Sequence, residues 1–130
     1  MTKGDDYRSL YQSYLDYCNA HDFDSMASFY TPTIKVNDGP MDPAAATAQF
    51  APLISAFPDW HWEMRHIVTD DDNIVVHFMV TGTHLGTFQG IGATGRRVAV
   101  SEFTHYHLEN GKFAEVWDLL DMDALLKQIS

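Results

Sequence analysis

The sequence has a single cysteine and few basic residues. Its one thiol, Cys18, excludes an internal disulfide bond and fits a protein kept in a reducing cytosol. Only 8 lysines and arginines stand against 18 aspartates and glutamates. The resulting net charge of −10 argues against a nucleic-acid partner, because nucleic acid is itself a polyanion. We therefore expect a cytoplasmic protein that does not bind nucleic acid.

Long apolar runs are also missing. No stretch approaches the roughly 20 apolar residues of a membrane helix, so we expect no membrane contact. The first ten residues, MTKGDDYRSL, lack the apolar segment that follows the basic residue of a secretory signal. Neither a phosphate-binding glycine loop nor a Gly-x-Ser-x-Gly motif occurs. These absences favour proton-transfer chemistry over covalent catalysis.

Aromatic residues, in contrast, are abundant. The chain has 3 Trp, 6 Tyr and 8 Phe, with 6 Met, among 130 residues that are 45% hydrophobic. This length predicts one domain over residues 1–130 with a single core. The aromatic and methionine side chains can fill that core, or they can line an apolar cavity for a flat organic ligand.

The pattern of apolar residues predicts helices first and strands afterwards. Helices are expected over residues 5–20, 22–30, 43–57 and 121–129. Strands are expected over residues 34–37, 60–69, 74–84, 97–108 and 113–117. Segregated helices and antiparallel strands predict an α+β fold. A curved antiparallel sheet would pack on the N-terminal helices and form a cone with an interior pocket.

Several short motifs resemble those of one protein family. They are Phe57-Pro58-Asp59, Gly82-Thr83-His84-Leu85-Gly86, Gly90-Ile91 with Thr94-Gly95-Arg96-Arg97, and Trp117-Asp118 before Leu125-Leu126-Lys127-Gln128. Together they span essentially the whole chain and resemble the SnoaL-like polyketide cyclases. The hairpin turn departs slightly from the family pattern, because Asn110 stands where aspartate is common.

The resemblance implies the cone-shaped α+β barrel of the nuclear-transport-factor-2-like superfamily. It also implies a homodimer formed through the outer face of the sheet and a small hydrophobic, polycyclic or polyketide-like ligand. Characterised cyclases of the family close a polyketide ring by intramolecular aldol condensation and use neither metal nor cofactor. We therefore expect a cofactor-independent cyclase or isomerase. The alternatives are epoxide opening, cofactorless hydroxylation or ligand binding alone, because one fold hosts many functions.

By the same resemblance, the acid/base aspartate falls on Asp118, at the end of the last predicted strand. Its alternative role is to cap the terminal helix. Asp121 is better placed for that cap, directly before the apolar stripe of the helix, and is also the second candidate for the catalytic aspartate. Beside Trp117 in an apolar pocket, the pKa of Asp118 is expected to rise toward the range useful near neutral pH.

The neighbours of Asp118 depend on the hairpin register. A two-residue turn puts Asp118 on the same face as His105 and His107, whereas a three-residue loop with a glycine bulge puts it opposite Glu102 or Thr104. The resemblance favours the second register, because the family has a polar pocket side chain at the position of Thr104. A Glu102–Asp118 pair would share a proton and raise one pKa, whereas the alternative for Glu102 is a solvated strand residue.

Five further residues are candidates for substrate binding. The Asn37 amide could hold a carbonyl oxygen, and the Tyr14 hydroxyl could donate to an enolate. Trp60 and Trp62 could stack on a polycyclic substrate, although core packing explains them and Tyr14 as well. His84 either hydrogen-bonds the ligand or orients the neighbouring glycine loop.

A metal site is not expected. His105 and His107 alternate on one face of their strand, but no glutamate follows at a spacing that would complete a metal site. Surface or interface positions explain both histidines, and His105 is kept as a candidate for substrate contact.

Overall fold

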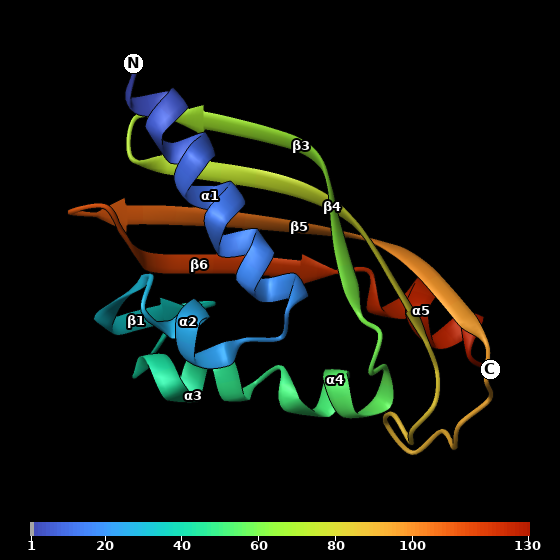
Figure 1. Cartoon of the computed structure of the whole chain (residues 1–130). Helices are drawn as coiled ribbons and strands as arrows, with labels where there is room; N and C mark the ends of the chain where they lie inside the picture. The colour runs from blue at the N-terminus through green and yellow to red at the C-terminus, as the bar shows by residue number, and fades with distance from the viewer. Residues whose placement is uncertain (1) are drawn as a thin grey trace.

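The computed structural model describes residues 2–130 as one sheet with helices packed against it (Figure 1). The helices are α1 (Lys3–Asn19), α2 (Phe23–Ala27), α3 (Pro43–Ala48), α4 (Ala51–Ala56) and α5 (Met122–Gln128). The strands are β1 (Tyr30–Val36), β2 (Gly39–Met41), β3 (His61–Asp70), β4 (Asn73–Thr83), β5 (Arg97–Glu109) and β6 (Lys112–Leu120). This arrangement confirms the predicted α+β class.

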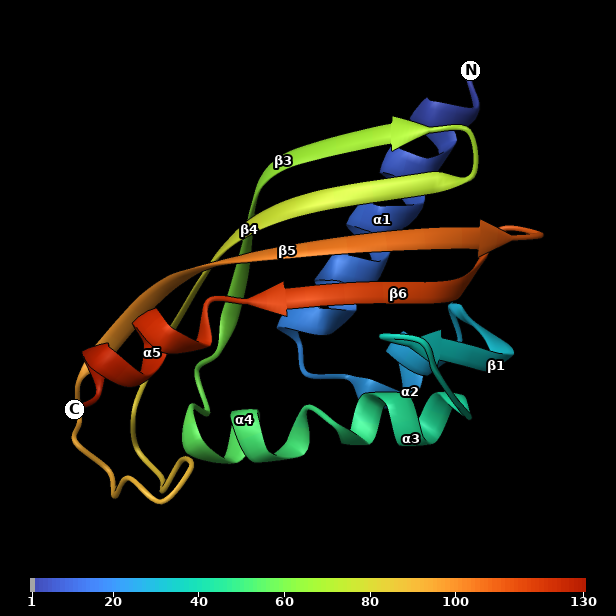
Figure 2. The ribbon, with the colours of Figure 1, turned by 180° about the vertical axis from the view of Figure 1, so that it is seen from behind.

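The six strands form one curved, unclosed sheet in the order β2-β1-β6-β5-β4-β3. Strands β3 to β6 make the predicted antiparallel meander, and side chains along β4 and β5 alternate between buried and more exposed positions. Strand β1 pairs with β6 in the parallel sense, and β2, which the sequence did not predict, pairs with β1. Figures 1 and 2 show β4 and β5 bending at the end of the sheet where α5 lies, with α1 across one face.

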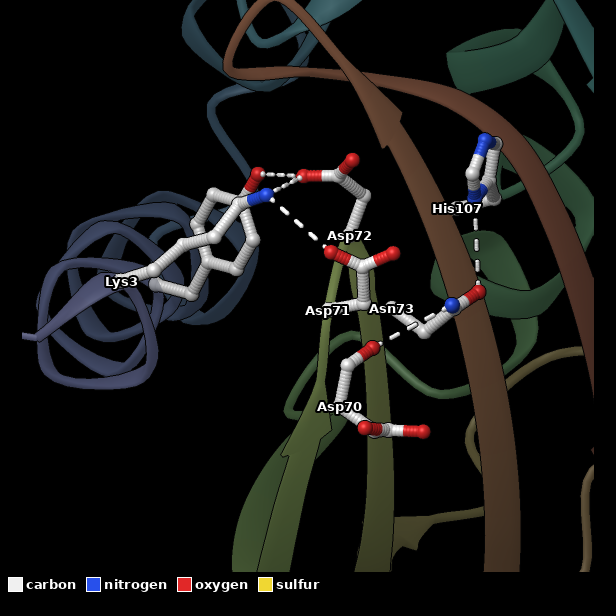
Figure 3. Close-up of polar contacts among 7 residues, drawn as sticks. Lys3, Asp70, Asp71, Asp72, Asn73 and His107 are labelled. Atoms are coloured by element: carbon white, nitrogen blue, oxygen red, sulfur yellow. Dashed lines mark hydrogen bonds and ion pairs between the residues drawn. The ribbon is translucent and has the colours of Figure 1, made fainter.

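Helix α1 is fixed to the sheet near both of its ends. At its start, Lys3 forms an ion pair with Asp72 in the β3–β4 turn (Figure 3), and the Tyr7 hydroxyl donates to the same carboxylate at 2.7 Å. At its end, the Asn19 side chain accepts from the backbone N–H of Trp62 at 2.8 Å and donates to its carbonyl at 3.0 Å. These contacts fix the position of α1 on the face of the sheet that it covers, which is called the inner face below.

One predicted helix is two helices in the structure. The helix expected over residues 43–57 divides into α3 and α4, which are separated by Gln49 and Phe50. Pro52 gives the physical reason, because proline has no N–H to donate to the preceding turn and its ring clashes with that turn. Asp42 caps the first of the two helices, as predicted.

Other differences lie at the ends of elements. The helix predicted over residues 22–30 ends at Ala27, because the chain enters β1 at Tyr30. The strand predicted over residues 113–117 continues to Leu120, so Asp118 lies inside β6 and not at its end. Among the helices of residues 2–130, none is long and apolar enough to cross a membrane.

Candidate active site

A cavity of about 360 Å³ lies between α1, the helices α3 and α4, and the inner face of the sheet. Its wall is mainly aliphatic and aromatic. The polar side chains that line it include Asn37, Glu102, Thr104 and Asp118, from β5, β6 and the turn after β1, together with four buried tyrosines. A mainly apolar cavity with a few convergent polar groups is the usual form of a small-molecule site.

The β5–β6 hairpin places Asp118 opposite Thr104. Its turn, Asn110-Gly111, has two residues with positive φ, as a type I′ turn requires. That turn alone would pair Asp118 with Phe103. A bulge at Ala114 adds one residue to β6, shifts the register by one and turns Asp118 toward the cavity.

The register therefore gives Asp118 the predicted neighbours Glu102 and Thr104, and the alternative with His105 and His107 on its face is wrong. The predicted cause was a three-residue loop, whereas the observed cause is a bulge further along the strand. The signal for this bulge in the sequence is the consecutive apolar pair of Phe113 and Ala114, both of which are buried.

Glu102 is a buried carboxyl group next to Asp118, and only 7% of the residue is exposed. Burial raises the pKa of Glu102 well above its ordinary value, and the charge of Asp118 and a hydrogen bond to that carboxylate raise it further. The Trp62 indole N–H donates to Glu102 Oε1 at 2.8 Å, which lowers the pKa without offsetting the rise. Burial therefore favours the protonated form of Glu102.

Asp118 is held on two sides at the mouth of the cavity. The Thr104 hydroxyl donates to Asp118 Oδ1 at 2.8 Å. The backbone N–H of Asp118 donates to Asn37 Oδ1 at 3.0 Å, and Asn37 itself has a left-handed φ of 48°. Thus β5 orients the carboxylate, the turn after β1 holds the backbone of Asp118, and Asp118 stays exposed.

The two tryptophan candidates have different positions. Trp62 lines the cavity and binds Glu102. Trp60 is 2% exposed and packs on Phe57 and on the backbone of Gly82. It is not among the residues that line the cavity, so its position fits the predicted alternative of core packing.

His84 and Asp121 also lie outside the cavity wall, where they support the fold. The His84 ring is fully buried, stacks on Phe57 and shares a hydrogen bond with Thr94 Oγ1 at 2.9 Å, which ties β4 to the glycine-rich loop. The Asp121 carboxylate accepts from the N–H of Ala124 at 3.1 Å and caps α5, as the sequence predicted.

His105 lies on the outer face of the sheet. Its ring contacts the Asn73 side chain at 3.0 Å and packs against Trp117. It borders a smaller hollow of about 200 Å³, which Phe103 and Leu119 also line. Asp118 also borders this hollow, whereas His105 is not among the residues that line the main cavity.

Sequence reasoning named Tyr14 but missed three more tyrosines in the cavity wall, namely Tyr11, Tyr30 and Tyr106. Burial raises the pKa of all four phenols, so they remain protonated donors near neutral pH. The helical spacing of Tyr11 and the strand spacing of Tyr106 from Thr104 were the available signals. Within residues 2–130, no group of three His, Cys, Asp or Glu side chains is placed to hold a metal ion.

Comparison with known proteins gives one family and one fold. The sequence profile of the SnoaL-like polyketide cyclases matches residues 8–129. A search of curated protein sequences gave no significant match.

Three solved structures illustrate the likeness. AclR from Streptomyces galilaeus, for which a hydroxylase activity has been suggested, is 25% identical with a TM-score of 0.87 over 98% of this chain and 97% of AclR. A SnoaL-like polyketide cyclase from Agrobacterium tumefaciens is 25% identical with a TM-score of 0.83 over 95% and 97% of the two chains. IdmH from Streptomyces antibioticus shares the fold at 20% identity and a TM-score of 0.82, over 93% of this chain and 96% of IdmH. This chain belongs to the SnoaL-like polyketide cyclase family.

Proposed function

We propose that the protein is a cofactor-independent enzyme that transfers protons in an aldol-type cyclisation or isomerisation of an apolar carbonyl compound. The observation that carries this proposal is the unequal carboxyl pair at the cavity wall. Glu102 is buried, and its pKa is raised well above the ordinary value, whereas Asp118 accepts a hydrogen bond from Thr104 and faces the cavity. Two neighbouring carboxyl groups in different environments, one of them with a raised pKa, suit general acid–base catalysis near neutral pH.

Asp118 acts as the general base in this proposal. Its carboxylate takes a proton from the carbon next to a substrate carbonyl, and the electron pair of that C–H bond forms an enolate. In a cyclisation, the enolate carbon bonds to a second carbonyl carbon of the same molecule. The resulting alkoxide then takes a proton from the carboxyl pair, so that Asp118 and Glu102 together return to their starting protonation state.

Asn37 is the best candidate to stabilise the enolate oxygen. The Thr104 hydroxyl already donates its hydrogen to Asp118, and His84 lies outside the cavity wall. Asn37 uses its carbonyl oxygen to accept from the backbone of Asp118, which leaves its amide N–H groups as donors at the cavity mouth. Donors aimed at a developing negative charge lower the barrier for enolate formation.

The test is exchange of the hydrogens next to the carbonyl of 1-tetralone for deuterium in D₂O, followed by proton NMR. The wild-type protein is expected to accelerate exchange, and Asp118→Asn is expected to lose about 10²- to 10⁴-fold of that acceleration. Asp24→Asn makes the same chemical change at an exposed position in α2 and is expected to leave the rate unchanged. Exchange that proceeds equally in wild type and Asp118→Asn would remove Asp118 from the chemistry.

Epoxide opening is the second candidate, because the same pair can supply a base for water and an acid for the epoxide oxygen. Glu102 would then be as essential as Asp118. Styrene oxide in H₂¹⁸O distinguishes the two reactions. Labelled diol formed by wild type, and lost equally in Glu102→Gln and Asp118→Asn, would favour epoxide opening over enolate chemistry.

A further inference from the structure

The buried tyrosines of the cavity wall form two hydroxyl pairs. Tyr11 and Tyr106 meet at 3.0 Å between their phenol oxygens, and Tyr14 and Tyr30 meet at 2.6 Å. All four residues are at most 7% exposed. Such polar groups in an otherwise apolar wall require partners, because a buried unpaired donor destabilises the fold by about 1–3 kcal/mol.

Counting hydrogens shows that the Tyr11–Tyr106 pair is incomplete. Two phenols carry two O–H hydrogens, and one hydrogen bond between them uses only one. Within residues 2–130, neither oxygen has another hydrogen-bond partner. One O–H hydrogen of this pair therefore has no acceptor among these residues, and both residues line the cavity.

The Tyr14–Tyr30 pair differs in this respect. Tyr14 also lies within hydrogen-bonding reach of the Cys18 thiol, a weak acceptor that burial keeps protonated by raising its pKa to about 12. The second hydrogen of this pair thus has a neighbour in the protein, and the stronger unmet donor belongs to Tyr11 and Tyr106.

Packing holds the Tyr11–Tyr106 pair in position. Tyr11 contacts the ring of Phe78 and that of Phe113, and Tyr106 packs on Phe113 with ring centroids 4.6 Å apart. These aromatic neighbours restrict rotation of both phenols. The leftover hydrogen therefore has a limited range of directions.

The geometry of β5 sets the separation between this pair and the carboxyl pair. Thr104 and Tyr106 are alternate residues on the inner face of β5, opposite Asp118 and Val116 respectively. Two residues along a strand advance about 7 Å. That separation suits a rigid bicyclic or larger ligand that carries one oxygen near Asp118 and another at its far end.

We propose that Tyr11 and Tyr106 form a second polar subsite, which donates a hydrogen bond to a carbonyl or hydroxyl oxygen at the end of the ligand remote from Asp118. This subsite rests on the proposed function for the identity of the end near Asp118. It selects fused-ring ketones with oxygen at both ends over equally apolar ketones with oxygen at one end.

The test compares two isosteric probes, 6-hydroxy-1-tetralone and 6-methyl-1-tetralone, by isothermal titration calorimetry. The hydroxyl and methyl groups have similar size and lie at the end of the bicycle remote from the ketone. Wild type is expected to bind the hydroxyl compound about 3- to 10-fold more tightly, as one net hydrogen bond allows. Equal affinities in wild type, or no binding of either ketone at millimolar concentration, would overturn the subsite.

The double variant Tyr11→Phe/Tyr106→Phe is expected to lose this preference. Both phenols must change, because either one alone retains a donor. Replacing both partners by rings of the same shape leaves no unpaired hydroxyl, so the variant should fold. Tyr7→Phe makes the same chemical change on α1 outside the cavity wall and should keep the preference. A folded double variant that still prefers the hydroxyl compound contradicts the proposal.

One further variant separates this subsite from the proposed reaction. Asp118→Asn should lose deuterium exchange but retain the preference for 6-hydroxy-1-tetralone, because the remote oxygen does not contact Asp118. If wild type and Asp118→Asn exchange deuterium at the same rate, the proposed function is contradicted but the subsite is not. If wild type binds 6-hydroxy-1-tetralone and 6-methyl-1-tetralone with equal affinity, the subsite is contradicted but the proposed function is not.

Discussion

Thr104 lies directly opposite Asp118 in the β5–β6 pair, and its hydroxyl donates to the Asp118 carboxylate at 2.8 Å. This relationship depends on the bulge at Ala114, which turns Asp118 toward the cavity. The position of the general base in the proposal is therefore set by one extra residue in β6.

Replacing Thr104 by valine should slow deuterium exchange of 1-tetralone about 10-fold. The change preserves shape but removes a hydrogen bond to a charged group, and such bonds contribute about 1.5–3 kcal/mol. Water at the exposed carboxylate replaces part of that contribution. Thr81→Val, an equivalent change elsewhere in the sheet, provides the control. An unchanged rate in Thr104→Val would mean that this contact does not orient the base.

Glu102→Gln should change how stability depends on pH. The folded-state pKa of Glu102 is raised, so the folded protein binds more protons than the unfolded chain above the unfolded value of about 4.3. The contribution of Glu102 to stability is therefore complete below that pH and is lost as the pH rises toward the folded pKa.

Between the unfolded and folded pKa values of Glu102, the free energy of unfolding of Glu102→Gln should rise relative to wild type by up to about 1.4 kcal/mol per pH unit. Urea unfolding at pH 5, 6 and 7 measures the difference, and Glu109→Gln at the exposed end of β5 is the control. Parallel stability profiles for Glu102→Gln and wild type would mean that Glu102 titrates normally.

Trp62→Phe should raise the pKa of Glu102 further. The indole N–H stabilises the charged form of Glu102 through the 2.8 Å hydrogen bond, and phenylalanine keeps the ring but not the donor. Carbon-13 NMR of the glutamate carboxyl carbons measures the shift. Trp117→Phe is the control, because the indole of Trp117 binds Asp38 and not Glu102. This variant should leave the Glu102 titration unchanged. A Glu102 titration that does not move in Trp62→Phe would refute the electrostatic role of Trp62.

Gly82→Ala should destabilise the fold by about 1–3 kcal/mol, as overpacking of a core does. An added Cβ would lie 3.0 Å from Trp60 Cε3 and 3.1 Å from Phe57 Cβ. Gly92→Ala is the matched control, because an added Cβ there has no atom within 4 Å. Chemical denaturation compares the two variants, and equal stability of both would show that the site around Trp60 can expand without cost.

Local patterns in the sequence were sufficient for much of the fold. The β-branched alternation of the long strands and the turn residues between them gave β3, β4 and β5 nearly as observed. Asp121 before its apolar stripe correctly predicted the cap of α5. The division of the third predicted helix was missed because the apolar stripe continues across the break, although Pro52 was its local signal.

The details of the candidate site depend on contacts between distant residues. The hairpin pattern left two registers open, and the bulge at Ala114 decides between them through burial of two consecutive residues. The bond from Trp62 to Glu102 joins residues 40 positions apart, and the Tyr11–Tyr106 pair joins residues 95 apart. Helical or strand periodicity indicates which face a residue occupies, but it does not say which distant side chain it meets.

The most direct test of the central claim is a carbon-13 NMR titration of Glu102 in wild type and in Asp118→Asn. The unequal carboxyl pair predicts that Glu102 in wild type titrates well above the ~4.3 of an ordinary glutamate. It also predicts that Asp118→Asn lowers this pKa, because the neighbouring negative charge is removed. A Glu102 that titrates near 4.3 in both proteins would contradict the pair and the proton-transfer chemistry built on it.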